Sequence, residues 1–265
     1  MVKIIVYVTD VDTHYQHAIS AGAKILIVLE DNPYGGNAFR VLIKKATSER
    51  LVLMTCGRKS EKGMTKKDFK KEFRHLYQPS AKEVVEVDVP TANFLMIDGE
   101  GDPNTSQEYA QAVEALFAVS YAIKFKIKRG ALALDYGVMP LEGLWWADDL
   151  SKFSIEDKTN WKWTMMIMQP SCVTPTIVEQ ALAEVAKKKS LAAISRLRME
   201  AFQEGHSAQM LHIGPFANEA TTIEKLHQFI AAKGKQAGTH HEIYLSDIRK
   251  KPAAKWKTIL RLPMR

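Results

Sequence analysis

The chain of 265 residues contains little cysteine and no long hydrophobic run, and each absence excludes a class of protein. Its two cysteines, Cys56 and Cys172, have neither the number for a disulfide framework nor the spacing of metal ligands. No segment approaches the ~20 apolar residues that a membrane-spanning helix needs. The N-terminus lacks the charged, apolar and small-residue regions of a signal peptide. The sequence therefore predicts a cytoplasmic protein that does not contact a membrane.

The motifs of several common enzyme classes are missing as well. The chain has no GxSxG elbow, no Walker A loop, no GxGxxG between a strand and a helix, and no HExxH helix. Serine hydrolases, nucleotide kinases, dinucleotide-dependent oxidoreductases and zinc proteases are therefore without support. His14 and His17 are spaced as surface residues of a short helix, and a metal site needs a larger convergent set of ligands. We expect neither a cofactor nor a metal.

The charge of the chain gives a weaker indication. The 37 Lys and Arg residues outnumber the 30 Asp and Glu residues, for a net charge of +7. No helix-turn-helix, zinc-finger or RNP-like motif accompanies this surplus, so we expect a solvated surface without direct contact to nucleic acid. The surplus lies in short runs at 44–45, 66–67, 70–71, 187–189 and 249–251.

The chain does contain one pattern that occurs twice. The first copy reads SAKEVVEVDVPTANFLMIDGEG, a helical stretch opening at Thr105, MPLEGLWWADD and WKWTMMIMQP. The second reads SRLRMEAFQEGHSAQMLHIGPF, a helical stretch opening at Thr221, THHEIYLSDIR and KWKTILRLPMR. Each copy predicts a hairpin, a helix and two more strands, and Thr105 with Glu108 and Thr221 with Glu224 are spaced as capping boxes. A small-molecule pocket is expected at the seam between two such halves.

The remaining residues give the domain organisation. Residues 1–56 predict a small βαβββ unit, residues 57–71 a basic linker, and residues 72–265 the duplicated domain. Thr174 and Pro175 predict the start of a helix that connects the two copies. The predicted fold class is α+β, with two pseudo-symmetric βαββ modules, a ligand cleft between them, and the small βαβββ unit in front. The helices are expected on one side of the sheets.

Glu242 is the sharpest candidate for a catalytic group. Alternate residues of a strand share a face, so Glu242, Tyr244 and Ser246 are predicted to point to one side. The carboxylate would take a proton from water or pair with a cation, and the phenol would orient it or donate to a developing oxyanion. Burial among Trp and Met side chains is expected to raise the pKa of Glu242. From the residues alone, a glutamate on a solvent-facing side of the strand stays open as the alternative.

Glu142 holds the matching place in the first copy, either as a second pocket acid or as a remnant of the duplication. Aromatic side chains beside it suit planar molecules and cations, although core filling is the alternative for each of them. Adjacent strand residues face opposite sides, so only one of Trp145 and Trp146 is expected to face the cleft. The candidate ligand-binding residues are Glu142, Trp145, Trp146, Trp163, Phe117, Tyr121, Met166 and Met168.

Residues 72–265 resemble the GyrI-like small-molecule-binding family. The resemblance rests on LYQPSAKEV, NFLMIDGEGDPNTSQEY, MPLEGLWWADD, WKWTMMIMQP, HIGPF and HHEIYLSD. It implies two βαββ modules with a ligand cleft and places Glu242 toward that cleft. EGLWW and HHEIYLSD are most similar to a stand-alone branch that hydrolyses the cyclopropane ring of DNA-alkylating natural products.

Residues 4–56 resemble half of a glyoxalase/bleomycin-resistance domain through VYVTDVDTHYQHAISAGAKI and EDNPYGG. The closing turn and the metal-binding glutamate of that family are replaced here by KKATSER and LVLMTC. The half-module is therefore functional by itself, paired with another chain, or vestigial.

Three functions from different classes follow as alternatives. The first is cofactor-independent hydrolysis of a reactive planar xenobiotic, with Glu242 activating water for attack on a cyclopropane ring. The second is non-catalytic drug binding or effector sensing, with Glu242 as the counter-ion of a cation. The third is a gyrase-modulating interaction through the protein surface. The expected partner is a small planar aromatic or cationic molecule, and the sequence leaves the oligomeric state open.

Overall fold

The computed structural model describes the strands at 3–7, 24–31, 37–45 and 48–55 and all of 66–147 and 158–265. The chain falls into two compact units, residues 1–66 with 127–135 and residues 67–126 with 136–265. In the first unit, the four strands form a sheet in the order β1-β4-β3-β2, with β1 parallel to β4. The strands are β1 (Lys3–Tyr7), β2 (Lys24–Asp31), β3 (Asn37–Lys45) and β4 (Ser48–Thr55).

These four strands lie where the sequence predicts them. The helix expected between the first two, with His14 and His17, lies outside the described residues. Within the described residues, no group of three His, Cys, Asp or Glu side chains is placed to hold a metal ion. No described helix has the length and apolar character needed to cross a membrane.

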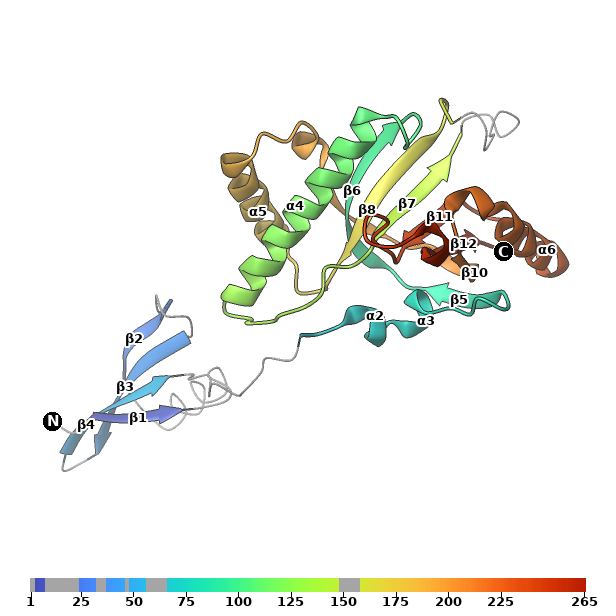
Figure 1. Ribbon diagram of the computed structural model, residues 1–265. Helices are drawn as coiled ribbons and strands as arrows, with labels where there is room; N and C mark the ends of the chain where they lie inside the picture. Colours follow the sequence, from blue (N-terminus) through green and yellow to red (C-terminus); the bar gives the residue numbers. More distant parts are fainter. Residues whose placement is uncertain (1–2, 8–23, 32–36, 46–47, 56–65, 148–157) are drawn as a thin grey trace. The chain divides into compact units, whose positions relative to one another are not determined.

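The second unit is built on an eight-stranded antiparallel sheet in the order β5-β10-β12-β11-β7-β8-β6-β9 (Figure 1). Short strands occupy both edges, and the two central strands come from different copies of the repeated pattern. The strands are β5 (Val85–Val89), β6 (Ala92–Glu100), β7 (Leu141–Trp146), β8 (Lys162–Gln169), β9 (Arg198–Phe202), β10 (Gly205–Ile213), β11 (His240–Tyr244) and β12 (Lys257–Pro263).

The strand order confirms the duplication. The strands follow in the same order on both sides of the central pair. Each side begins with the third strand of one copy (β7 or β11), followed by the fourth strand (β8 or β12) and the second strand (β6 or β10) of that copy. The first strand of the other copy (β9 or β5) lies at the edge. The predicted hairpins are wrong, because β5 pairs with β10 and β9 pairs with β6. Each copy thus gives its first strand to the other copy. The alternation of apolar residues defines a strand but cannot reveal which neighbour it pairs with.

The helices of this unit are α2 (Phe69–Glu72), α3 (Arg74–Tyr77), α4 (Gln107–Arg129), α5 (Pro175–Lys188) and α6 (Ala220–Lys233). Short 3₁₀ turns are η2 (Ile194–Arg196), η3 (Phe216–Asn218) and η4 (Ala253–Lys255). The predicted start of the connecting helix is confirmed, because the Thr174 side chain accepts a hydrogen bond from Ile177 N–H at the start of α5.

The two predicted capping boxes need correction. At α4 the Ser106 hydroxyl, rather than that of Thr105, accepts the hydrogen bond from the backbone N–H of Tyr109. At α6 the turn η3 continues directly into the helix, so Glu219 takes the N-cap position and Thr221 lies in the first turn. The 3₁₀ turn η3 in front of α6 shifts the start of the helix, and a capping-box motif does not reveal such a turn.

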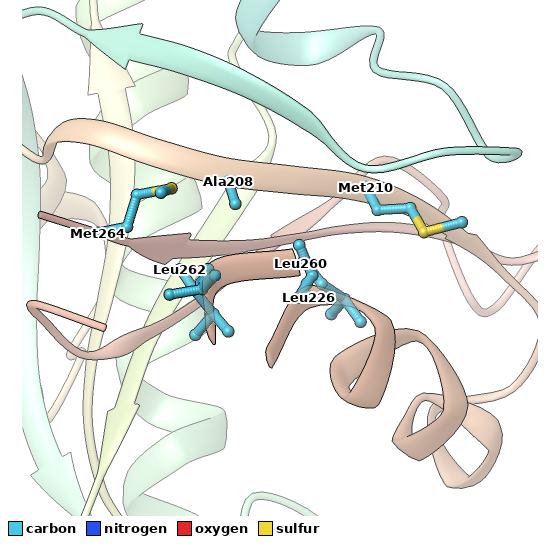
Figure 2. Packing of buried hydrophobic residues seen from close by; sticks show 7 residues of the cluster. Ala208, Met210, Leu226, Leu260, Leu262 and Met264 are labelled. Atoms are coloured by element: carbon cyan, nitrogen blue, oxygen red, sulfur yellow. The ribbon is translucent and has the colours of Figure 1, made fainter. Parts of the chain in front are cut away.

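Helices α4 and α6 cover the same face of the sheet. Leu226 and Ile230 of α6 pack on Ala208, Met210, Leu260, Leu262 and Met264, which project from β10, β12 and the C-terminus (Figure 2). Tyr109 of α4 packs against Trp145 and Trp163 on the same side. The short helix α3 lies on the other side of the sheet, where Tyr77 contacts Glu142. The expectation that all helices lie on one side is therefore wrong for α3.

Candidate functional site

Strand register places Glu242 on the face covered by α4 and α6. In the central pair, Glu242 lies directly opposite Gly143, and His240 lies opposite Trp145. Residues directly opposite each other in an antiparallel pair point to the same side, and so do alternate residues of one strand. Glu242, Tyr244, His240 and Trp145 consequently share one face at the junction of the two copies.

A chain of hydrogen bonds connects these four side chains. Trp145 Nε1–H donates to the Tyr244 hydroxyl at 3.1 Å, and that hydroxyl donates to Glu242 Oε2 at 2.7 Å. His240 Nε2 lies 3.1 Å from Glu242 Oε1. The Glu242 side chain is 12% exposed, so it is largely buried.

The protonation behaviour of Glu242 differs from the expectation. Burial alone would raise the pKa of its carboxyl, but the hydrogen bond and charge of His240, the Tyr244 hydrogen bond and the Lys158 charge together lower it. Glu242 is thus an anion at neutral pH. The pKa of Tyr244 is raised well above its usual value by burial and by the Glu242 charge, so the phenol stays protonated. The sequence prediction failed here because it counted burial without the donors.

Further aromatic rings pack around Trp145 on this face. Trp145 packs edge-on against Trp161 with ring centres 5.5 Å apart, and Tyr109 packs edge-on against Trp163 at 5.4 Å. The Lys158 ammonium lies over the Trp161 ring at 4.8 Å. Trp145, Trp161 and Trp163 are 3%, 8% and 0% exposed, so these rings pack against one another in the core. Their stacking on a planar or cationic ligand stays a prediction.

Beyond Tyr244, Phe216 of η3 packs edge-on against its ring at 5.8 Å and also contacts Trp256 at 5.0 Å. Aromatic side chains from both copies therefore lie around Tyr244, which donates to the Glu242 carboxylate.

Two glycines make room for the tryptophans. Gly143 lies opposite Glu242, and a Cβ at this position would come within 2.8 Å of Trp145 Nε1. Gly99 lies opposite Trp163, and a Cβ there would come within 2.2 Å of its indole ring. Each indole packs against a glycine that has no side chain, and the space at Gly143 lets Trp145 reach Tyr244. The sequence offered no signal for these roles beyond a glycine inside a strand.

Glu142 does not share the face of Glu242. It lies opposite Ile243, one residue out of step with the Glu242–Gly143 pair, and so points to the other side of the sheet. There the Tyr77 hydroxyl donates to Glu142 Oε1 at 2.8 Å, and Glu142 Oε2 forms an ion pair with His241 Nε2 at 3.1 Å. The interpretation of Glu142 as the equivalent of Glu242 in the first copy is therefore wrong.

His241 extends this second network. Its Nδ1 lies 2.9 Å from Glu204 Oε2, which also accepts from Arg261 at 3.0 Å. The flanking carboxylates Glu204 and Glu142 outweigh burial and raise the pKa of His241 to about 9, while His241 and Arg261 lower that of Glu204 to about 2. The side chains of His241 and both glutamates are 1% exposed. The network holds the two copies together and has no access to solvent.

The remaining candidates divide between the two faces. Trp145 and Trp163 lie on the Glu242 side, whereas Trp146 points to the opposite side. Met166 and Met168 also point to the Glu142 side, because Met166 lies opposite Glu142. Placing these two methionines in the cleft is therefore wrong, since their strand presents its odd-numbered residues to α4.

Phe117 and Tyr121 belong to a separate row on α4. The Tyr121 ring lies between those of Phe117 and Phe125, with centres 6.4 Å apart on each side, and Tyr121 is 47% exposed. Phe117 follows Tyr109 by about two helical turns. A role for these two rings in ligand binding stays a prediction.

Glu219 is a residue that the sequence reasoning missed. It caps α6 just after η3 and is 5% exposed. Burial and the Glu242 charge raise its pKa to about 9. The nearby Thr258 hydroxyl favours the ionised form, yet neither Glu219 Oε1 nor Thr258 Oγ1 has a hydrogen-bond partner in the described part of the chain. The sequence predicted the start of α6 at Thr221, and Glu219 therefore fell outside the predicted helix.

One surface pocket lies elsewhere, beside α6. Its lining residues include His227, Ile230 and Gly234, and it contains none of the aromatic or acidic residues around Glu242. The candidate site therefore rests on the side-chain arrangement at the central strands.

Comparison with known proteins agrees with this architecture. The model of the GyrI-like small molecule binding domain matches residues 82–265. Two crystal structures from Listeria innocua, an uncharacterized conserved protein and a hydrolase, are each 42% identical, with TM-scores of 0.70 and 0.68. A further Listeria innocua hydrolase is 40% identical, with a TM-score of 0.66. Each covers 76% of this chain and 100% of its own. Among curated proteins no match is found.

Proposed function

Because this chain belongs to the GyrI-like small-molecule-binding family, we propose that its second unit binds planar hydrophobic or cationic molecules at Glu242 and hydrolyses reactive ones. The reaction is cofactor-independent opening of a cyclopropane ring, and its role is detoxification of a xenobiotic. Glu242 accepts a proton from the attacking water, and Tyr244 positions the carboxylate. The hydrolase names carried by two relatives at 40–42% identity support this reaction class.

One observation carries the proposal, the hydrogen-bonded chain from Trp145 through Tyr244 to Glu242. A general base must be ionised, positioned and within reach of the water it deprotonates. The lowered pKa keeps Glu242 ionised, two neighbours fix its oxygens, and its partial exposure admits water. The surrounding rings exclude bulk solvent, and a planar substrate would stack on them once they move apart.

The reaction balances without any further reagent. The water oxygen bonds to a ring carbon and its proton passes to Glu242, while the strained carbon–carbon bond breaks and its electron pair takes up a proton from solvent. Glu242 then returns its proton to solvent, so the sum is the addition of one water molecule. Relief of ring strain supplies driving force, while the site supplies orientation. A base with a lowered pKa is a weaker acceptor, so positioning contributes more than basicity here.

The second candidate function is binding without catalysis. The lowered pKa of Glu242 favours it specifically, because a permanent carboxylate between aromatic rings suits a planar cation. In that case Glu242 is a counter-ion, and the protein sequesters or senses its ligand.

The experiment that separates the two compares wild type, Glu242→Gln and Glu224→Gln. Glu224 lies exposed on α6 and provides the same substitution outside the site. Initial rates are measured with a neutral cyclopropane-bearing alkylator, and dissociation constants with that alkylator and with a cationic planar dye.

If Glu242 is the base, Glu242→Gln lowers the rate by about 10²–10⁴ and leaves affinity for the neutral compound nearly unchanged. If Glu242 is a counter-ion, the variant loses the dye selectively and wild type shows no turnover. A Glu242→Gln protein with wild-type rate and wild-type affinity for both compounds would remove Glu242 from the site.

A further inference from the structure

The Tyr136 hydroxyl is a buried donor that has no hydrogen-bond partner in the part of the chain that the structure describes. Tyr136 is 1% exposed, and burial raises the pKa of its phenol, so the hydroxyl stays protonated at neutral pH. The residue is fixed in place, because Gly137 N–H donates to the Lys67 carbonyl and the Phe69 ring packs edge-on against the phenol at 5.8 Å. Since a buried donor without a partner lowers stability, a fixed donor of this kind indicates that an acceptor is bound or formed beside it.

Cys172 is the residue that the fold brings to this hydroxyl. In the antiparallel pair of β7 and β8, the ladder ends with Leu141 opposite Ile167. Tyr136 lies five residues before Leu141 and Cys172 lies five residues after Ile167, so both segments leave the sheet at the same end. The charge of a Cys172 thiolate acts on the Tyr136 phenol, in agreement with this placement. The cysteine is free and partly exposed, so a small molecule from solvent can reach its sulfur.

The segment that carries Cys172 is held in place as well. Val173 N–H donates to the Pro170 carbonyl at 2.9 Å, which closes a turn around the cysteine. Directly after this turn, the Thr174 side chain caps α5. The sulfur and the phenol are therefore both carried by backbone that hydrogen bonds fix.

We propose that Cys172 is a reversible oxidation site, at which a hydroperoxide converts the thiol to a sulfenic acid and the Tyr136 O–H donates to the new oxygen atom. The modified sulfur supplies the acceptor that Tyr136 lacks. This inference is independent of the proposed hydrolysis, because neither residue belongs to the hydrogen-bonded network of Glu242.

The oxidation balances with hydrogen peroxide as the one co-reactant. The Cys172 sulfur, after loss of its proton, attacks one peroxide oxygen, so that an S–O bond forms and the O–O bond breaks. The second oxygen leaves as hydroxide and takes up the proton to give water. The sulfur is oxidised by two electrons and the peroxide is reduced by two. Added thiols reverse the change, because they remove the oxygen as water and form their own disulfide.

Tyr136 determines how long the sulfenic acid lasts. Attack of its sulfur on a second peroxide gives a sulfinic acid, which thiols do not reduce. A hydrogen bond from the phenol withdraws electron density from the sulfur through the oxygen and so slows this second attack. The same bond stabilises the folded protein, because a buried donor gains its partner.

Peptide mass spectrometry tests the modification in the full-length protein. Wild type, Tyr136→Phe and the control Tyr121→Phe, which removes a hydroxyl from an exposed position on α4, are treated with hydrogen peroxide. The sulfenic acid is trapped with dimedone at successive times. We expect dimedone on Cys172 in all three proteins, and conversion to sulfinic acid about 3- to 10-fold faster in Tyr136→Phe alone, the worth of one neutral hydrogen bond. Dithiothreitol added before dimedone should restore the thiol.

Three results of this experiment would overturn the inference. They are an unmodified Cys172, a disulfide between Cys172 and Cys56 in place of the sulfenic acid, and equal rates of conversion in wild type and Tyr136→Phe.

Melting curves before and after oxidation give a second readout. The melting temperature of wild type should rise by about 2–4 °C on oxidation, because the Tyr136 hydroxyl gains an acceptor. Tyr136→Phe lacks the donor and Cys172→Ser lacks the sulfur, so neither should show this rise. An unchanged or lower melting temperature of oxidised wild type, or an equal rise in Tyr136→Phe, would show that the hydroxyl and the sulfenic acid are not partners and would overturn the inference.

Discussion

At the scale of single residues, the properties of Glu242 come from its hydrogen-bond donors. Burial alone would neutralise it, and two side chains of its own strand, His240 and Tyr244, keep it ionised. The Tyr244 hydroxyl is itself held by Trp145 Nε1–H, so the orientation of the carboxylate depends on an indole from the other copy. Small changes at these three positions should therefore alter the pKa of Glu242 before they alter the fold.

Tyr244→Phe tests this dependence. The variant keeps the ring and its contact with Phe216 but removes the donor to Glu242. We expect the pKa of Glu242 to rise, because burial is then opposed by fewer favourable contacts. In a rate–pH profile the acidic limb of turnover should move to higher pH, with a lower maximum. An acidic limb at the wild-type position would show that Tyr244 does not set the protonation of Glu242.

His241 supplies a second prediction at this scale, the dependence of stability on pH. Its folded pKa of about 9 lies above the usual 6.5, so its contribution is complete below pH 6.5 and is lost as pH rises through 9. The pKa of Glu219 is raised from 4.5 to about 9, so its ionisation lowers the free energy of unfolding as pH rises from 4.5 to 9. The pKa of Glu204 is lowered to about 2, so the free energy of unfolding falls as pH drops below 4.5.

Stability is therefore expected to peak near pH 4.5 and to decline toward pH 9. Chemical denaturation at a series of pH values measures this. His241→Gln should be destabilised by about 3–5 kcal/mol near pH 6, because it leaves the buried Glu142 carboxylate without its cation and Glu204 with Arg261 alone. A wild-type protein most stable at pH 9 would contradict the account of this network.

At the scale of elements, the central pair β7–β11 both joins the copies and carries the site. Its register places Gly143 opposite Glu242, and this leaves space for the Trp145 indole to reach across to Tyr244. The two faces of the pair have different tasks. One carries the largely buried Glu242 carboxylate and the aromatic rings, and the other carries the ion-pair network of His241.

Gly143→Ala tests the role of this register. The added Cβ would meet Trp145 Nε1 and Met165 Sδ at 2.8 and 3.1 Å, so the indole must move. We expect a cost of about 1–3 kcal/mol from overpacking, together with weaker ligand binding because Trp145 no longer holds Tyr244. Denaturation and a binding titration measure the two effects. A variant with lower stability but wild-type ligand affinity would separate Trp145 from the site.

Much of each element could be predicted from the sequence. Alternation placed Glu242 and Tyr244 together on one face of β11, and Thr174 with Pro175 gave the start of α5. The one-residue offset between Glu142 and Glu242 could not be predicted, because a repeated motif gives positions along a strand and not the register between strands. Glu219 was missed for a related reason, since η3 moved the start of α6.

At the scale of the whole molecule, the exchange of first strands makes the two copies of the second unit one folding unit. β5 of the first copy pairs with β10 of the second, and β9 of the second copy pairs with β6 of the first. Neither copy therefore has a complete sheet of its own. This feature could not be predicted from the repeats, because sequence similarity shows that a pattern recurs and not how the copies interlock. The site between β7 and β11 depends on both copies in the same way.

Hydrogen exchange in the full-length protein tests this interdependence. Amides of β6 and β8 from the first copy and of β10 and β12 from the second should exchange through the same global opening, with equal free energies. The edge strands β5 and β9 should exchange faster, because each has one neighbour. Global protection in only one copy would show that the copies unfold separately.

The central claim is that Glu242 delivers a water molecule to a strained ring carbon, and isotope labelling tests it most directly. A neutral cyclopropane-bearing alkylator is incubated with enzyme in water enriched in ¹⁸O, and the ring-opened product is analysed by mass spectrometry over time. The account predicts one ¹⁸O atom per product molecule, formed well above the uncatalysed rate by wild type and about 10²–10⁴-fold more slowly by Glu242→Gln. Product formation at the same rate by both proteins, or at the uncatalysed rate by wild type, would contradict it.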